Sequence, residues 1–133
     1  MKRLIIIFGL VTVVLAVLAF VLVDTIPPRS LTATHMMILK RRVLQFAHSR
    51  GELPLSLTDL PELRGFHDRV RDGWGRDIEF DVSSSGVVTL RSLGRDGIVG
   101  GSGEDADMIA SFPSRDERGR WSDEMVQWSH NPF

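Results

Sequence analysis

The chain has 133 residues, a formal net charge of −1 and no cysteine. This length allows one small domain, and the missing cysteines exclude disulfides, thiol catalysis and cysteine metal sites. No basic stripe of the kind that follows phosphates is present, so nucleic acid is not an expected partner.

Residues 4–23, with the sequence LIIIFGLVTVVLAVLAFVLV, form an uncharged apolar run. A helix of that length spans about 30 Å, the thickness of the hydrocarbon core of a bilayer. Lys2 and Arg3 precede the run and Asp24 follows it, which predicts a cytoplasmic N-terminus and translocation of the rest of the chain. We therefore predict a cytoplasmic start and single-pass transmembrane anchor over residues 1–23. The alternatives are a cleaved signal peptide and a buried core helix.

Pro27 and Pro28 interrupt helical geometry, so a short stiff linker is expected over residues 24–30. A second helix is expected to begin near Ser30 to Thr34, where hydroxyl groups can cap it, and to end at Gly51. Apolar residues then recur at spacings of three and four, which predicts an amphipathic helix. Its apolar stripe comprises Met36, Leu39, Val43 and Phe46, widened by Met37, Leu44 and Ala47. The other face is expected to carry most of the polar residues, namely Lys40, Arg41, Arg42 and Gln45. That face is either solvated or in contact with lipid headgroups or a partner.

Three segments after this helix are typical of β-strands. Residues 77–82 alternate acidic and apolar side chains, residues 83–86 read as a turn, and residues 87–93 read as the return strand of a hairpin. Residues 108–112 are a candidate third strand, and WSDEMVQW at 121–128 is a candidate helical turn. The predicted fold class is α+β, with the amphipathic helix packed on a small antiparallel sheet over residues 31–112 and a C-terminal extension over 113–133.

The segment LGRDGIVGGSGEDAD, residues 93–107, is rich in glycine and in acidic residues. Its glycines let the chain fold back, so that Asp96, Glu104, Asp105 and Asp107 can converge. Converging carboxylates need a proton or a cation, and Arg95 alone cannot balance four acids. Ca²⁺ suits oxygen ligands in flexible geometry better than Mg²⁺ does, and no histidine is near for Zn²⁺. The alternative is a solvated loop whose aspartates make local turns.

The sequence contains a GELP loop at 51–54, a DGWG turn at 72–75, the predicted hairpin, and the glycine-rich loop at 93–107. Together these motifs resemble the periplasmic domain of the type II secretion system major pseudopilin. The resemblance covers roughly residues 31–110 and implies a pseudopilin-like fold and one calcium ion in the loop. It also implies carboxylate ligands from Asp96, Asp105 and Asp107, backbone carbonyls from Leu93 and Ile98, and Glu104 in reserve.

The N-terminus departs from the pattern of that family, in which a peptidase cuts after a glycine and a glutamate occupies the fifth mature position. Here Gly9 lies inside the apolar run, Leu10 follows it, and Val14 stands at the position of the glutamate. The resemblance implies a structural component of, or beside, a type II secretion apparatus in the bacterial inner membrane, with other pseudopilins or secretion proteins as partners. The alternative is a membrane-tethered periplasmic protein-binding module that is neither processed nor polymerised.

No nucleophile motif, histidine metal spacing or phosphate-binding loop occurs in the sequence. The glycine-rich loop opens no helix that could hold a phosphate. We therefore expect neither an enzyme nor a small-molecule substrate.

Overall fold

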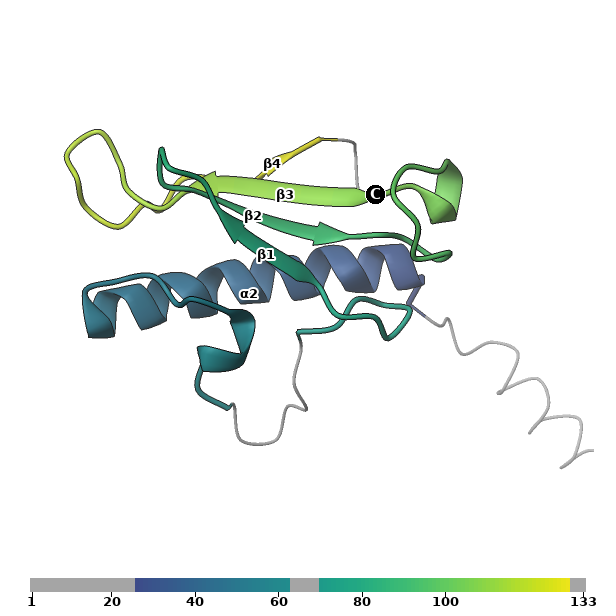
Figure 1. Cartoon of the computed structure of the whole chain (residues 1–133), viewed down its shortest axis with the longest axis horizontal. Coiled ribbons are helices and arrows are strands. Elements are labelled where there is room, and N and C mark those ends of the chain that lie inside the picture. The colour runs from purple at the N-terminus through teal and green to yellow at the C-terminus, as the bar shows by residue number, and fades with distance from the viewer. Residues whose placement is uncertain (1–25, 63–69, 130–133) are drawn as a thin grey trace, which may run out of the picture.

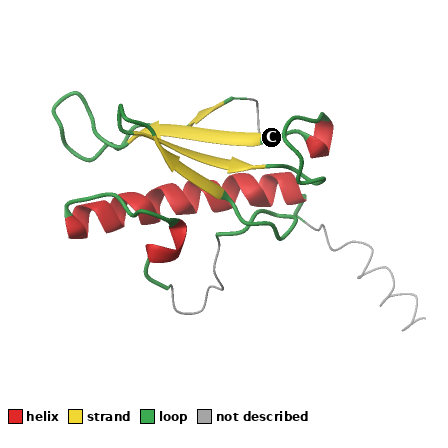
Figure 2. Cartoon of the chain, in the orientation of Figure 1, coloured by secondary structure: helices red, strands yellow, loops and turns green. Residues whose placement is uncertain are grey.

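The computed structural model describes residues 26–62 and 70–129. Within these two ranges lie one long helix, α2 (Pro28–Arg50), the 3₁₀ helices η1 (Leu57–Asp59) and η2 (Gly103–Asp105), and four strands. The strands are β1 (Glu79–Val82), β2 (Val87–Ser92), β3 (Met108–Pro113) and β4 (Gln127–Trp128). Figure 1 shows α2 lying across one face of the sheet, and Figure 2 shows the long loops at the two ends of the strands.

The predicted anchor over residues 4–23 lies outside the described residues. Within the described ranges, no helix combines the length and the apolar character of a membrane span.

Helix α2 begins earlier than the sequence predicted, at Pro28 rather than near Ser30 to Thr34. Proline suits the first turn of a helix, because its fixed φ is already helical and no partner is needed there for the missing N–H. The Leu31 N–H donates to the Pro27 carbonyl at 3.0 Å, and no side chain of the described residues caps the N-terminus of the helix. The Thr32 hydroxyl instead donates to the Pro28 carbonyl one turn earlier, at 2.8 Å. The predicted linker over residues 24–30 therefore ends in the first turn of α2.

The predicted apolar stripe of α2 faces the sheet, with one difference. Met36, Leu39, Val43 and Ala47 are fully buried, and Phe46 and Leu44 pack against the core at its margin. Met37, expected to widen the stripe, is 55% exposed.

Arg42 was predicted on the opposite face of α2 but is buried, with 8% of its surface exposed. Its guanidinium donates to the Pro61 carbonyl at 2.9 Å and so ties the loop after η1 to the helix. A long arginine stem can cover apolar surface while its head finds a polar partner, which explains why a charged residue occupies this position.

The four strands form one antiparallel sheet in the order β1-β2-β3-β4. The predicted hairpin is confirmed, with Phe80 opposite Leu90 and Val82 opposite Val88. The turn between β1 and β2 is closed by Ser83, whose hydroxyl accepts the Val87 N–H at 3.0 Å. Strand β3 then pairs along the whole of β2, from Val87 opposite Pro113 to Ser92 opposite Met108.

The core lies between α2 and the inward face of β2 and β3. Val88 and Leu90 of β2 alternate with half-buried neighbours, and Ala110 and Phe112 do the same in β3. These four side chains meet the stripe of α2, and their burial supplies the main apolar stabilisation of the domain. The predicted α+β arrangement of one amphipathic helix on an antiparallel sheet is confirmed.

The segment at 121–128, predicted as a helical turn, contains no helical turn, and its last two residues form strand β4 instead. In β4, Gln127 lies opposite Ser111 and Trp128 lies opposite Ala110 of β3. Residues in the predicted C-terminal extension therefore belong to the sheet, and Trp128 and Val126 pack against the core. From Val126 to Ser129 apolar and polar side chains alternate, which is the period of a strand.

Candidate functional site: the glycine-rich loop

The loop over residues 93–107 joins β2 to β3 and is closed by backbone hydrogen bonds. The Arg95 N–H donates to the Glu104 carbonyl at 2.9 Å, and the Asp107 N–H donates to the Gly100 carbonyl at 3.0 Å. Helix η2 lies inside this closed segment, next to the N-terminal end of α2 (Figure 1). The loop thus has an ordered backbone of its own rather than a simple connection between strands.

Two glycines allow the loop to close around Asp105. A Cβ atom at Gly94 or at Gly101 would lie 2.5 Å from the Asp105 carbonyl oxygen, and both residues have positive φ angles of 66° and 79°. Any L side chain at either position would meet backbone atoms and adopt a disfavoured conformation at once. The glycine spacing seen in the sequence therefore reflects how tightly the loop wraps its own backbone.

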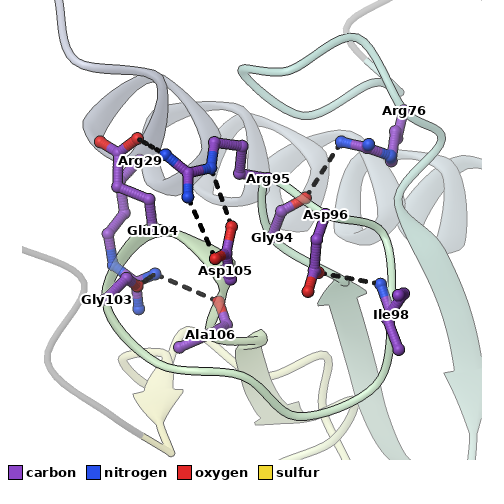
Figure 3. A network of polar contacts seen from close by, with 10 residues as sticks. All are labelled: Arg29, Arg76, Gly94, Arg95, Asp96, Ile98, Gly103, Glu104, Asp105 and Ala106. Atoms are coloured by element: carbon purple, nitrogen blue, oxygen red, sulfur yellow. Dashed lines mark hydrogen bonds and ion pairs between the residues drawn. The ribbon is translucent and has the colours of Figure 1, made fainter.

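The acidic side chains of the loop do not gather around a single point. Asp105 is paired with Arg95, whose Nε and Nη2 atoms donate to its two carboxylate oxygens at 2.8 and 3.1 Å (Figure 3). Glu104 lies 3.9 Å from the same guanidinium. Asp96 Oδ1 accepts the Ile98 N–H at 3.0 Å, and Asp107 Oδ1 accepts the Gly100 N–H at 3.2 Å.

Arg95 acts as the internal cation of the loop. The hydrogen bond with Asp105 raises the pKa of Arg95 above its ordinary value, with further contributions from the charges of Asp105, Glu104 and Asp96. The pair is partly solvated, since 59% of the Arg95 side chain and 32% of the Asp105 side chain are exposed. Exposed ion pairs are weak and are screened by salt, so the bidentate geometry contributes more to order than to stability.

Two arginines from distant parts of the chain hold the loop from outside. Arg29, in the first turn of α2, donates from one nitrogen to the carbonyls of Gly103 and Ala106 at 3.0 and 3.2 Å. Arg76 donates to the Gly94 carbonyl at 3.2 Å. Figure 3 shows these two side chains approaching the loop from different sides. The carbonyls of the loop are therefore directed towards cations at two places besides Arg95.

The turn over residues 72–76 positions this support. Asp72 is buried, with 4% of its surface exposed, and its Oδ1 accepts the N–H groups of Trp74 and Arg76 at 3.0 and 2.9 Å. Its Oδ2 accepts the Ser92 hydroxyl at 2.7 Å. The Gly94 N–H in turn donates to Ser92 Oγ at 3.3 Å. A continuous chain of hydrogen bonds thus runs from the turn to the first residues of the loop.

The same turn is also pressed against α2. A Cβ atom at Gly73 would lie 2.0 Å from the Pro28 carbonyl oxygen, and the Gly73 N–H donates to the Thr32 hydroxyl at 2.8 Å. The turn, the loop and the first turn of α2 therefore form one connected corner of the molecule.

The predicted calcium ligands fit the ion in chemistry, but in this structure Asp105 is paired with Arg95, and Asp96 and Asp107 accept backbone N–H groups. Carboxylates and backbone carbonyls are the oxygen donors that Ca²⁺ takes, and Asp96, Asp105 and Asp107 all lie in one short loop. Leu93 precedes its first turn, and Ile98 lies at its exposed tip with 67% of its surface exposed. Within residues 26–62 and 70–129, however, no three acidic or histidine side chains converge as a metal site would require.

The sequence analysis missed the residues that hold the loop from outside. The DGWG motif predicts only a turn at Asp72, and nothing in its spacing indicates the bond to Ser92, which is twenty positions away. Arg29 and Arg76 carried no signal, because single arginines outside a motif are usually solvated.

The chain was also compared with known proteins. No protein-family model matches it, and no curated protein or solved structure does either.

Proposed function

We propose that the chain is a structural, pseudopilin-like component of, or beside, a type II secretion apparatus, with a periplasmic domain stabilised by calcium in the loop over residues 93–107. The observation that carries the proposal is the architecture of that loop. It is closed by its own backbone, anchored to α2 and to the turn at 72–76, and lined with carboxylates whose oxygens suit a hard cation.

In this proposal Asp96, Asp105 and Asp107 hold the ion together with the carbonyls of Leu93 and Ile98. Since Asp105 is engaged by Arg95, ion binding through Asp105 competes with that guanidinium. The ion supplies charge compensation that one arginine gives only in part. An ion that binds only the folded loop stabilises the domain by about 2.7 kcal/mol at a hundredfold excess over its Kd.

The test is thermal unfolding of the full chain in detergent micelles, with calcium chloride and then with a chelator. Because 1 kcal/mol shifts the midpoint of a domain of this size by about 4–8 °C, calcium at that excess should raise it by about 10 °C or more. Asp96→Ala should abolish the shift. Asp81→Ala is the matched control, because Asp81 is an exposed aspartate of β1 outside the loop. An unchanged midpoint for the wild-type chain would remove calcium from the proposal.

A second candidate is a membrane-tethered periplasmic protein-binding module that does not polymerise. The observation that favours it is Val14, which stands where a pseudopilin carries its assembly glutamate. Mass spectrometry of the mature protein distinguishes the two candidates. A mature N-terminus at Leu10 supports a processed pseudopilin, whereas an intact Met1 supports the tethered module.

A further inference from the structure

An open groove of about 720 Å³ lies between the outer side of α2 and the segment that leads into β4. Its apolar lining comes from Met37 and Leu44 of α2 and from Met125, Val126 and Trp128 of the C-terminal segment. The groove shares no residue with the loop over 93–107. Its volume is in the range of sites that enclose a ligand or several side chains of a partner.

Two methionines at the groove are unusually exposed. Met37 has 55% of its surface exposed and Met125 has 86%. Methionine is flexible and polarisable, and surfaces that adapt to peptide partners use it frequently. Exposed apolar side chains gathered along a groove are typical of an interaction site rather than of a surface that contacts only water.

Among the residues that the structure describes, β4 is an edge strand of the sheet, so it offers backbone hydrogen-bonding groups at the same place. Gln127 lies opposite Ser111, and the Ser129 N–H donates to the Ile109 carbonyl at 3.1 Å. Backbone groups alternate in direction along an antiparallel strand, so those of Val126 and Trp128 point away from β3. An edge of this kind is a template for an added strand.

The charges beside the groove are mainly positive. Helix α2 contains no acidic residue, and among the described residues Lys40 and Arg41 contribute to the groove against the single acid Asp123. Lys40 is turned towards the C-terminal segment, where it donates to the Glu124 carbonyl. Arg41 is exposed, and no ion pair to it is formed within the described residues. A carboxylate on a bound partner would supply that missing charge.

We propose that this groove binds an extended polypeptide segment of a partner protein, which pairs with β4 as an additional strand, buries apolar side chains between Met37 and Met125, and places a carboxylate beside Arg41. The edge strand favours a polypeptide partner over an anionic lipid surface, because a lipid headgroup offers no row of N–H and C=O groups to pair with those of Val126 and Trp128. Backbone pairing would supply affinity, and the apolar and charged contacts would supply specificity.

The experiment measures fluorescence anisotropy of a labelled short peptide of alternating valine and glutamate, titrated with the full chain in detergent micelles. Saturable binding is expected. Replacing glutamate by lysine, or methylating alternate peptide nitrogens, should each lower the affinity at least tenfold. Arg41→Glu should weaken binding of the glutamate peptide about tenfold, equivalent to about 1.4 kcal/mol. Arg118→Glu is the matched control and should change it less than about twofold, because Arg118 is exposed but outside the groove lining.

Four outcomes would overturn the proposal. The first is no binding of the glutamate peptide to a correctly folded chain, with folding checked by circular dichroism. The second is equal binding of the N-methylated peptide, which would exclude strand pairing. The third is Arg41-dependent binding to phosphatidylglycerol vesicles without peptide binding, which would assign the surface to lipid. The fourth is an affinity for the glutamate peptide that rises more than tenfold in a chain ending at Ser129, which would make residues 130–133 the occupant of the groove. None of these results depends on calcium, so they are separate from the test of the loop.

Discussion

Replacing Asp72 by alanine tests whether the turn at 72–76 organises the glycine-rich loop. The substitution removes acceptors for the Trp74 N–H, the Arg76 N–H and the Ser92 hydroxyl, at 3.0, 2.9 and 2.7 Å. Hydrogen bonds to a charged group contribute about 1.5–3 kcal/mol each, and a buried donor left without a partner costs about 1–3 kcal/mol. Since Ser92 is fully buried, it cannot turn to water.

These contributions are not additive, so we expect Asp72→Ala to lower the free energy of unfolding by about 3–5 kcal/mol. The midpoint of thermal unfolding should then fall by at least about 12 °C for a domain of this size. Asp72→Asn, which keeps an acceptor at the position of Oδ1, should cost roughly half as much. Hydrogen exchange should show faster exchange of the Gly94 amide in Asp72→Ala, because its acceptor Ser92 loses its anchor.

The measurement is urea unfolding of the full chain in detergent, followed by circular dichroism, with Asp81→Ala as the exposed control. That control should stay within about 0.5 kcal/mol of the wild type. A loss below about 1 kcal/mol for Asp72→Ala would refute the reasoning, as would equal losses for both variants. Either result would mean that the loop is ordered without help from this turn.

Two further predictions concern the loop and the turn after β3. Gly101→Ala should lower the free energy of unfolding by about 2–4 kcal/mol in the same urea assay, because the new Cβ would lie 2.5 Å from the Asp105 carbonyl oxygen and φ is 79°. Gly100→Ala has open space around its Cβ, so it should lower the free energy of unfolding by only about 1–2 kcal/mol through backbone strain. The hydrogen bond from the Arg120 backbone, followed by the one from the Arg120 side chain, lowers the pKa of Asp116 below its ordinary value of 3.8. The contribution of Asp116 to stability is therefore present at a pH above its pKa in the unfolded chain. It is lost as the pH falls through its pKa in the folded chain. The stability difference between wild type and Asp116→Asn should therefore shrink below about pH 4, and a difference independent of pH would contradict this assignment.

The elements with a clear hydrophobic period were predictable from the sequence. Alternation fixed the hairpin, because Ile78, Phe80 and Val82 can share one face only in a strand. The spacing of Met36, Leu39 and Val43 likewise fixed the buried side of α2. Local patterns of this kind depend on neighbours in sequence, and burial then follows directly.

The errors arose where a long-range contact outweighed a local preference. Arg42 is polar by type, yet it is buried because the Pro61 carbonyl offers its head a partner. The segment containing β4 is short and charged, which favoured the prediction of a helical turn. In the structure, pairing with Ser111 and Ala110 makes β4 a strand. For the candidate site, the closure of the loop was predictable from its glycines. The supporting arginine of α2 was not predictable, because it lies far from the loop in sequence.

The contact between Gly73 and Pro28 has a mechanical consequence. The chain enters the domain through Ile26 and Pro27, and the first turn of α2 is also where the turn at 72–76 and the loop at 93–107 attach. Tension applied to the polypeptide upstream of Ile26 would thus load this corner first, ahead of the strands. Arg29, which connects α2 to the loop, lies in this corner. Pulling on the N-terminal side would therefore strain the loop at 93–107 before the strands of the sheet began to separate.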